Sequence, residues 1–288
     1  MKRVFILGSV NTDLVITATR FPEQGETVSG KDFFVARGGK GANQAVACAR
    51  SGGKTLFCGC VGDDAFGKEA LSSLQKEGID VRNVKVVPNC PSGTALIVLI
   101  DGNNRIIVDS GANARIEQKD VDDFLSRAED GDIFLTQAEI PTDIVLYALK
   151  QAKEKGLFTI LNPAPAAETL LPCLPYCDLI APNETEAKIL GGKDVLSHVP
   201  VVLTTLGENG YEIATEKEIR NYPCKKITPV DTTGAGDTFC GALAARLSIN
   251  VDLFDAARFG SAAATLACTK KGAQPSIPTL QEINEWSY

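Results

Sequence analysis

The sequence contains very little histidine, the side chain that most often serves as an acid-base group or a metal ligand. Among 288 residues there is one, His198. A single imidazole excludes a histidine-rich zinc centre, which draws on two or more of these side chains. If the protein uses a general base, carboxylates are therefore the first candidates.

Long apolar runs and an excess of positive charge are absent as well. No apolar stretch approaches the roughly 18 residues of a membrane-spanning helix. The apolar stretch that follows Met1 stops at Gly8, which is too short for a signal peptide. With 29 Lys and Arg against 36 Asp and Glu, the formal net charge is −7. Nucleic acids and anionic membranes attract basic surfaces, so neither is an expected partner.

Nine cysteines are present, an odd number scattered over the chain. This pattern does not match a disulfide framework. Free thiols persist in reducing compartments, so we expect a cytoplasmic protein.

Short apolar runs alternate with segments of helical periodicity, which favours an α/β fold. Helices are expected at Ala42–Arg50, Lys68–Glu77 and Thr142–Lys155, each followed closely by glycine. The runs expected as strands are apolar throughout, as in strands buried on both faces: Val4–Gly8, Leu56–Val61, Ile133–Thr136, Phe158–Leu161, Leu179–Ala181 and Val201–Thr204. The alternation predicts a mainly parallel central sheet with helices on both faces.

Two segments, 14–37 and 92–112, depart from this alternation and predict antiparallel strands. The second contains Asp-Gly within the turn Asp101–Asn104, between two β-rich runs, which is a strong hairpin signal. We expect both segments to leave the main sheet and form one small β-sheet. Such a sheet suits a lid over a cleft or a dimer contact. The alternative is that these strands extend the main sheet.

The segment Asp231–Asp237 is a small-residue loop that leads into an Ala- and Leu-rich helix. Its glycines let backbone N–H groups approach a ligand closely. The helix N-terminus adds unpaired donors and the positive end of a dipole, so we expect an anion site. Asp237 is either the helix N-cap or a general base beside a bound phosphate. From this loop alone the cap is favoured.

Polar residues also follow several of the expected strands. Ligands of open α/β sheets bind beyond the carboxyl ends of the strands. Asn11, Asp13 and Glu139 are therefore candidates for bonds to hydroxyl groups, or else ordinary polar turn residues. The segment Gly38–Ala45 is either a ligand-binding turn or a flexible turn before a helix. Asn183–Glu186 has the spacing of a capping box.

Seven segments, taken together and in this order, resemble the ribokinase-like (PfkB-type) carbohydrate kinases. They are Gly8–Asp13, Gly38–Asn43, Asn162–Ala166, Asn183–Glu186, Thr205–Gly210, Asp231–Asp237 and Lys271–Ser276. The resemblance covers nearly the whole chain. It implies a single ribokinase-like three-layer α/β/α domain over residues 1–288, with a mainly parallel central sheet and a small β-sheet lid.

The resemblance implies transfer of the ATP γ-phosphate to the 5-hydroxyl group of D-ribose. Asp237 would then be the general base rather than a cap. The backbone N–H groups of Gly234, Ala235, Gly236 and Asp237 would form an anion hole, because phosphoryl transfer depends mainly on positioning and electrostatic stabilisation. The alternatives are a related kinase for 2-deoxyribose, another pentose, a hexose or a nucleoside, and a non-catalytic sugar-binding protein.

The resemblance also assigns residues to each ligand and implies a homodimer formed through the lid. The sugar-contacting positions are Asn11, Asp13, Gly39, Lys40, Asn43, Glu139 and Asp237. The ATP-contacting positions are Asn183, Thr205, Leu206, Gly207, Glu208, Asn209, Gly210, Gly236, Asp237 and Ser261. Indirect contacts to Mg²⁺ are expected from Asn183 and Glu186. Contacts to an activating K⁺ are expected from Asp231, Thr233, Ala267, Lys270, Gly272 and Ser276.

Overall fold

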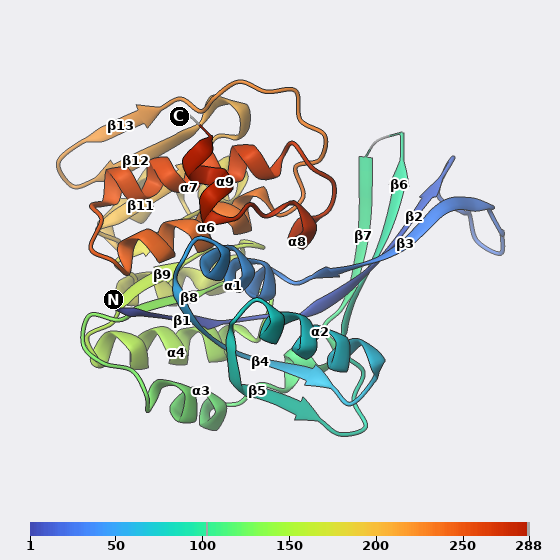
Figure 1. Cartoon of the computed structure of the whole chain (residues 1–288), viewed down its shortest axis with the longest axis horizontal. Coiled ribbons are helices and arrows are strands. Elements are labelled where there is room, and N and C mark those ends of the chain that lie inside the picture. The colour runs from blue at the N-terminus through green and yellow to red at the C-terminus, as the bar shows by residue number, and fades with distance from the viewer. Residues whose placement is uncertain (102, 287–288) are drawn as a thin grey trace.

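The computed structural model describes residues 1–101 and 103–286. Within them the backbone forms a nine-stranded sheet with helices on both faces and a separate four-stranded sheet that projects away from it (Figure 1). The large sheet has the order β13-β12-β11-β10-β9-β8-β1-β4-β5. Its strands are β1 Arg3–Leu7, β4 Lys54–Gly62, β5 Asp80–Val87, β8 Ile133–Thr136, β9 Phe158–Leu161, β10 Leu179–Ile180, β11 Val201–Thr205, β12 Tyr211–Thr215 and β13 Ile219–Tyr222.

The large sheet is mainly parallel, as the sequence predicts. Antiparallel pairing occurs between β11 and β12 and between β12 and β13, and the other neighbours run parallel. Each of the predicted strands is present. The sequence does not predict β5, β12 and β13, because polar residues interrupt the apolar runs that indicate a strand buried on both faces.

The helices cover both faces of the large sheet. On one face lie α1 Lys40–Arg50, α2 Ala65–Lys76, α6 Ala235–Leu247 and α7 Leu253–Ala267, and on the other lie α3 Gln118–Leu125 and α4 Thr142–Glu154. The shorter elements are α5 Glu184–Ile189, α8 Ala273–Ser276 and α9 Leu280–Glu285, with 3₁₀ turns at Gly111–Arg115, Glu168–Tyr176, Gly192–Ser197 and Gly207–Asn209.

Strand β1 illustrates why a continuous apolar run predicts a central strand. Val4 and Ile6 belong to the core that includes residues of α1 and α6, whereas Phe5 and Leu7 belong to the core that includes residues of α3 and α4. Successive side chains of a strand point to opposite faces, so a strand covered on both faces needs an apolar residue at every position.

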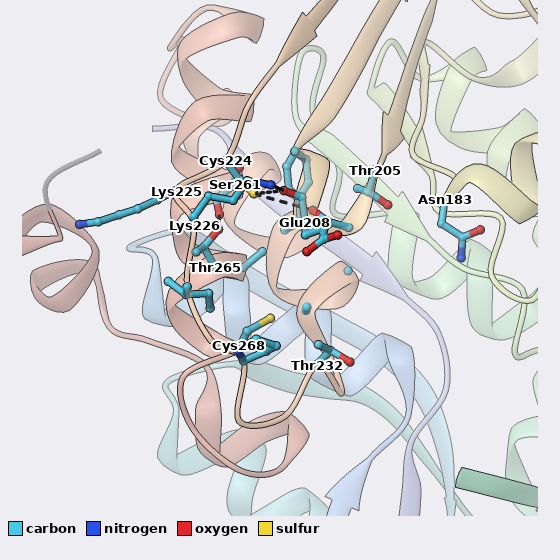
Figure 2. A pocket seen from close by; sticks show the side chains of 18 of the residues that line it. Asn183, Thr205, Glu208, Cys224, Lys225, Lys226, Thr232, Ser261, Thr265 and Cys268 are labelled. Carbon is cyan, nitrogen blue, oxygen red and sulfur yellow. Dashed lines mark hydrogen bonds between the residues drawn. The ribbon is translucent and has the colours of Figure 1, made fainter. Parts of the chain in front are cut away.

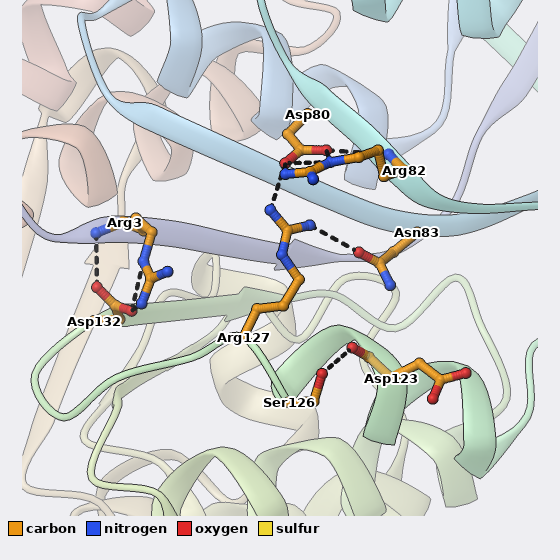
Figure 3. Close-up of polar contacts among 8 residues, drawn as sticks. All are labelled: Arg3, Asp80, Arg82, Asn83, Asp123, Ser126, Arg127 and Asp132. Carbon is orange, nitrogen blue, oxygen red and sulfur yellow. Dashed lines mark hydrogen bonds and ion pairs between the residues drawn. The ribbon is translucent and has the colours of Figure 1, made fainter.

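Ionic contacts hold the ends of the strands that lie away from the polar loops. Arg3, the first residue of β1, donates from Nε and Nη2 to Asp132 Oδ2 at 3.0 and 2.7 Å, which anchors the residue just before β8 (Figure 3). Arg127 donates to Asp80 Oδ2 at 2.6 Å and to Asn83 Oδ1 at 3.1 Å, and so ties β5 to the segment after α3. These contacts fix the amino-terminal ends of the strands, opposite the ends where ligands bind in open α/β sheets.

The small sheet, named the lid here, consists of β2 Asn11–Ala18, β3 Gly30–Gly38, β6 Gly93–Ile100 and β7 Asn103–Asp109, in the order β3-β2-β6-β7. It is separate from the large sheet, so the alternative that these strands extend the main sheet is wrong. The pairs β2–β3 and β6–β7 are antiparallel, as predicted, but β2 and β6 pair in parallel. This parallel pairing joins two hairpins that are distant in sequence, and no local pattern specifies it. Of the predicted turn, Gly102 lies outside the described residues.

All nine cysteines are free thiols, in agreement with the absence of a disulfide pattern. Cys48, Cys58, Cys60, Cys173, Cys177 and Cys240 are buried. In the described part of the chain, no helix is long and apolar enough to cross a membrane.

Candidate functional site

Polar residues follow four adjacent parallel strands at the carboxyl edge of the large sheet. Ser9 follows β1, Gln137 and Glu139 follow β8, Asn162 follows β9, and Asn183 follows β10. These strands are consecutive neighbours in the sheet. Their loops therefore open at one edge, where ligands of open α/β sheets bind.

Asp237 is the third residue of α6 and does not cap it. Gly234 occupies the N-cap position in a left-handed conformation, with φ of 75°. The Asp237 carboxylate instead points to α1, where Asn43 Nδ2 donates to Oδ2 at 3.0 Å and Gln44 Nε2 donates to Oδ1 at 3.1 Å. The cap interpretation is wrong because the loop's glycine takes the cap position and α1 supplies partners for the carboxylate.

The Asp237 side chain is 6% exposed and lies among charged groups. Burial raises the pKa of Asp237, while the Lys40 ammonium and the amides of Asn43 and Gln44 oppose the rise, and Glu139 adds to it. A carboxyl group with a raised pKa accepts a proton more readily than an exposed one. This is the property expected of a general base.

The start of α6 offers backbone donors to an anion. The first intrahelical bond runs from Thr238 N–H to Gly234 O at 2.8 Å, so the preceding N–H groups have no partner within the helix. The Ala235 N–H donates to Thr232 O at 3.2 Å. The N–H groups of Gly236 and Asp237 are thus the ones that the helix geometry leaves for an anion.

Glu139 joins two of the predicted ligand segments. Its Oε2 accepts hydrogen bonds from Ser9 Oγ at 2.6 Å and from the backbone N–H of Lys40 at 2.9 Å. Burial lowers the pKa of Lys40, but the carboxylates of Asp237, Glu139 and Glu186 outweigh this effect and raise it. The Lys40 side chain therefore stays protonated among three acids.

Asp13 lies beside the same acids. Burial, followed by the charges of Glu139 and Asp237, raises the pKa of Asp13 to about 6. A Cβ atom at Gly38 would collide with the Asp13 carboxylate, and one at Gly39, where φ is 86°, would meet the backbone of residues 9–11. Both glycines therefore allow the start of α1 to approach β2.

Asn11 and Asn43 present amides to the same region. Asn11 Oδ1 accepts from Asn113 Nδ2 at 2.8 Å. Asn43 Oδ1 is buried, and the described residues supply no hydrogen-bond partner for it. A buried acceptor without a partner is destabilising, so it indicates a place for a ligand's hydroxyl group.

A cavity of about 430 Å³ lies on the other side of the α6 N-terminus. Ser261 and Thr265 of α7 and Cys268, the residue just after this helix, line one side, and Asn183 and Thr205 lie on the opposite side (Figure 2). Its lining includes these predicted residues: Asn183, Thr205, Gly207, Glu208, Gly210, Gly236 and Ser261. Ala235, which the sequence predicts as part of the anion hole, also lines it. The lining further includes residues that sequence reasoning missed: Glu184, Thr185, Cys224, Lys225, Lys226, Ile227, Pro229, Thr232, Phe239, Ala264, Thr265 and Cys268.

Three of the residues predicted to contact the nucleotide do not line this cavity. Leu206 and Asn209 build the glycine turn instead, through the bonds Leu206 N–H to Gly210 O at 2.8 Å and Asn209 N–H to Leu206 O at 3.0 Å. Asp237 faces α1 and the acids rather than the cavity. The missed residues at 264, 265 and 268 could have been predicted from the sequence, because they follow Ser261 at helical spacing.

Asn183 and Glu186 form the predicted capping box at the start of α5. Asn183 Oδ1 accepts from the Glu186 N–H at 2.8 Å, and Glu186 Oε2 accepts from the Asn183 N–H at 2.8 Å. Burial raises the pKa of Glu186, with Asn183 and Lys40 opposing and Asp237 adding to the rise. Glu186 therefore lies within electrostatic reach of both Lys40 and Asp237, and its chain neighbours Glu184 and Thr185 line the cavity. Oxygen donors at this junction suit Mg²⁺.

Asp231 connects the two segments predicted to hold a monovalent cation. Its Oδ1 accepts from Thr233 N–H at 2.9 Å and Oγ1 at 2.7 Å, and its Oδ2 accepts from Gly272 N–H at 2.8 Å. Lys270 pairs with Glu282 at 2.6 Å and Ser276 Oγ donates to Ala273 O. Residues 1–101 and 103–286 contain no group of three or more His, Cys, Asp or Glu arranged to hold a metal. A cation here would therefore depend on backbone carbonyls such as that of Ala267, and on water.

Comparison with known proteins identifies similar chains. The family described as pfkB family carbohydrate kinase matches residues 1–280. The ribokinase of Haemophilus influenzae is 38% identical over 300 residues, covering 99% of this chain and 98% of that protein. The structure of Arabidopsis thaliana ribokinase complexed with ribose and ATP is 32% identical, with a TM-score of 0.89 and coverage of 99% and 98%. A deoxyribokinase of Salmonella typhi is 32% identical over 299 residues, covering 98% of each chain.

Proposed function

Because the chain belongs to the pfkB family of carbohydrate kinases, we propose that it transfers the γ-phosphate of ATP to O5 of D-ribose. One observation carries this proposal. Gly236 and Asp237 are consecutive, yet Gly236 lines the cavity beside α7 and the Asp237 carboxylate faces α1 and the acids. An acceptor hydroxyl beside Asp237 and a phosphate beside Gly236 would thus be neighbours at the α6 N-terminus.

The proposed reaction is an in-line displacement at the γ-phosphorus. Asp237 takes the proton of the sugar hydroxyl as its oxygen forms the new O–P bond, and the bond to the β-phosphate oxygen breaks to release ADP. The N–H groups of Gly236 and Asp237 stabilise the charge on the transferred group, and Lys40 adds a positive charge nearby. Asp237 then gives up its proton to solvent.

The residues around Asp13 supply the proposed sugar contacts. The Asp13 carboxylate accepts from neighbouring sugar hydroxyls, and the unpartnered Asn43 Oδ1 accepts from another. Glu139 orients Lys40 and Ser9 around the same space. A ligand with several hydroxyl groups satisfies these acceptors, which supports a sugar over an apolar substrate.

Magnesium and potassium are the proposed cations. Mg²⁺ would arrive with ATP near Asn183 and Glu186 and neutralise phosphate charge. Potassium would be held by the two loops that Asp231 connects. We further propose that residues 1–288 act as one domain in the cytoplasm, with residues 14–37 and 92–112 covering the bound sugar.

Replacing sodium chloride by potassium chloride at equal ionic strength should raise kcat several-fold. The expected reason is that a cation at the 231 and 272 loops holds the Gly236 and Asp237 N–H groups in place. Initial rates of ADP release in the two salts, with choline chloride as a third arm, measure the effect. Equal rates in sodium and potassium would contradict this part of the proposal.

The lid is the proposed contact between two copies of the chain. Its strands expose these large apolar side chains: Phe33, Phe34, Val35, Leu96, Ile106, Ile107 and Val108. The strand pairing places Val35, Leu96 and Ile107 on the same face, and monomeric proteins rarely expose large apolar patches. We expect Ile107→Glu to convert a dimer of 30.6 kDa chains into monomers in light scattering. The matched control is Ile219→Glu on β13, a similarly exposed position that should leave the dimer intact. A wild-type chain that is monomeric, or an Ile107→Glu dimer, would contradict the lid contact.

Release of ADP that depends on ribose is the direct test of the proposed function. The purified chain should consume ATP when ribose is present, and much more slowly when no sugar is added. A better rate with 2-deoxyribose would favour the alternative of a deoxyribose kinase. Sugar binding without ADP release would favour the non-catalytic alternative.

A further inference from the structure

Gln44 is a fully buried residue of α1 whose amide contacts three other side chains. Its Nε2 donates to Asp237 Oδ1 at 3.1 Å and to Asn162 Oδ1 at 3.0 Å. Its Oε1 accepts from Gln137 Nε2 at 2.7 Å. Both protons and the carbonyl of this amide are therefore engaged, and none of the roles assigned to the site so far explains it.

The hydrogen bonds of Asn162 and Gln137 fix the orientation of the Gln44 amide. Asn162 Nδ2 donates to the Ala181 carbonyl at 2.7 Å, and a backbone carbonyl can only accept. Asn162 must therefore turn Oδ1 toward Gln44, which in turn must present Nε2. Gln137 reinforces this orientation, because its Nε2 donates to Gln44 Oε1. The Gln137 Oε1 atom itself is buried without a partner among the described residues.

The result is that Asp237 receives one donor on each oxygen. Asn43 holds Oδ2 and Gln44 holds Oδ1, so rotation of the carboxylate would break one hydrogen bond or both. Hydrogen bonds to the charged form of a carboxyl group stabilise that form. The ionisable groups that also act on Asp237 are Lys40 of α1, Asp13 of β2, Glu139 after β8, Glu186 of α5 and Cys240 of α6.

We propose that Gln44 is a positioning residue: held by Asn162 and Gln137, it presents an N–H to Asp237 Oδ1 and fixes the carboxylate to accept the sugar's proton. This inference rests on the proposed kinase function. It assigns to the β9 and β10 loops, through Asn162 and the Ala181 carbonyl, a part in orienting a base on α6.

The first test is Gln44→Met, which keeps the length of the side chain and removes its donors. We expect kcat to fall about 10- to 100-fold, because a hydrogen bond to a charged group is lost, while the KM for ribose stays within about threefold. Without that donor the ionised form of Asp237 is less stable, so its pKa rises. The acid limb of the kcat profile should therefore move to higher pH by about one unit.

The second test is Asn162→Leu, alone and combined with Gln44→Met. If Asn162 acts through Gln44, the single variant shifts the acid limb in the same direction, and the double variant is no slower than Gln44→Met alone. The control is Thr159→Val, a buried β9 residue whose hydroxyl bonds to Tyr176 O and Asp178. It should lower the unfolding temperature and leave the pH profile unchanged.

The outcomes separate this inference from the function on which it rests. Ribose-dependent turnover by the wild type, combined with a Gln44→Met variant of normal kcat and normal pH profile, overturns the inference alone. The inference is also overturned if the two substitutions lower kcat by independent factors that multiply in the double variant and neither moves the acid limb of the pH profile. That result indicates a packing role. If Gln44→Met does not fold, the acid limb of Asn162→Leu decides. A wild type without ribose-dependent turnover overturns both.

Discussion

Replacing Asp237 by asparagine should lower kcat about 10²- to 10⁴-fold, the usual contribution of a positioned general base. Ribose and ATP should still bind. The substitution removes the proton acceptor but hardly changes the shape of the side chain. Gln44 can still donate to the new amide oxygen, and the unpartnered Asn43 Oδ1 can turn to accept from the new NH₂ group.

Turnover and binding of the Asp237→Asn variant are measured separately. Coupled ADP release gives kcat, calorimetry gives ribose affinity, and the fluorescence of Trp286 reports on nucleotide binding. Trp286 is the only tryptophan in the sequence, and it lies beside Lys225, a lining residue of the cavity, at 4.1 Å from ring centroid to Nζ. The control is Asp252→Asn, at the N-cap of α7, which should keep normal turnover. An Asp237→Asn enzyme within tenfold of wild type would remove the general-base assignment.

Replacing Asp13 by alanine should raise the KM for ribose about 100-fold, because hydrogen bonds from sugar hydroxyls to a charged acceptor are lost. The wild type should discriminate against 2-deoxyribose, which lacks one of the hydroxyls that Asp13 is proposed to bind. In the Asp13→Ala variant this discrimination should largely disappear. Steady-state kinetics with both sugars gives the comparison, and discrimination that survives the substitution would place the selecting contact elsewhere.

The pH dependence of ribose binding gives an independent check on Asp13. Its pKa is raised to about 6, so the carboxylate is charged above this pH and protonated below it. The KM for ribose should therefore rise as the pH falls through 6, and Asp13→Asn should lack this inflection. In the unfolded chain Asp13 has its ordinary pKa of 3.8, so between about pH 4 and 6 the folded chain holds a proton that the unfolded chain has released. The contribution of Asp13 to the free energy of unfolding therefore falls as the pH rises through this range. The Asn variant should thus be more stable at neutral pH.

The sequence predicts those parts of the fold and site that depend on local pattern. The apolar runs identify the central strands because both faces of the sheet are covered, and the spacing of Asn183 and Glu186 identifies a capping box. Edge strands such as β13 escape prediction because their exposed positions carry polar residues. The parallel pairing of β2 with β6 escapes it because the partners are far apart in the chain.

The environment of Asp237 shows a different limit. The Asp231–Asp237 loop fixes a helix start, but whether Asp237 caps that start depends on partners almost two hundred residues away, in α1. Gln44 is inconspicuous in the sequence for the same reason, since its contacts to Gln137, Asn162 and Asp237 arise only when two loops and two helices meet. By contrast, residues 264, 265 and 268 could have been found from Ser261 by helical spacing alone.

Phosphorus NMR of the reaction mixture tests the central claim most directly. The purified chain is incubated with ribose, ATP, magnesium and potassium, and the product is compared with a mixture containing the Asp237→Asn variant. We predict one ADP for each ribose consumed and a phosphate monoester whose phosphorus couples to the two protons of C5. A phosphate on another carbon, or ADP formation that does not require ribose, would contradict the account.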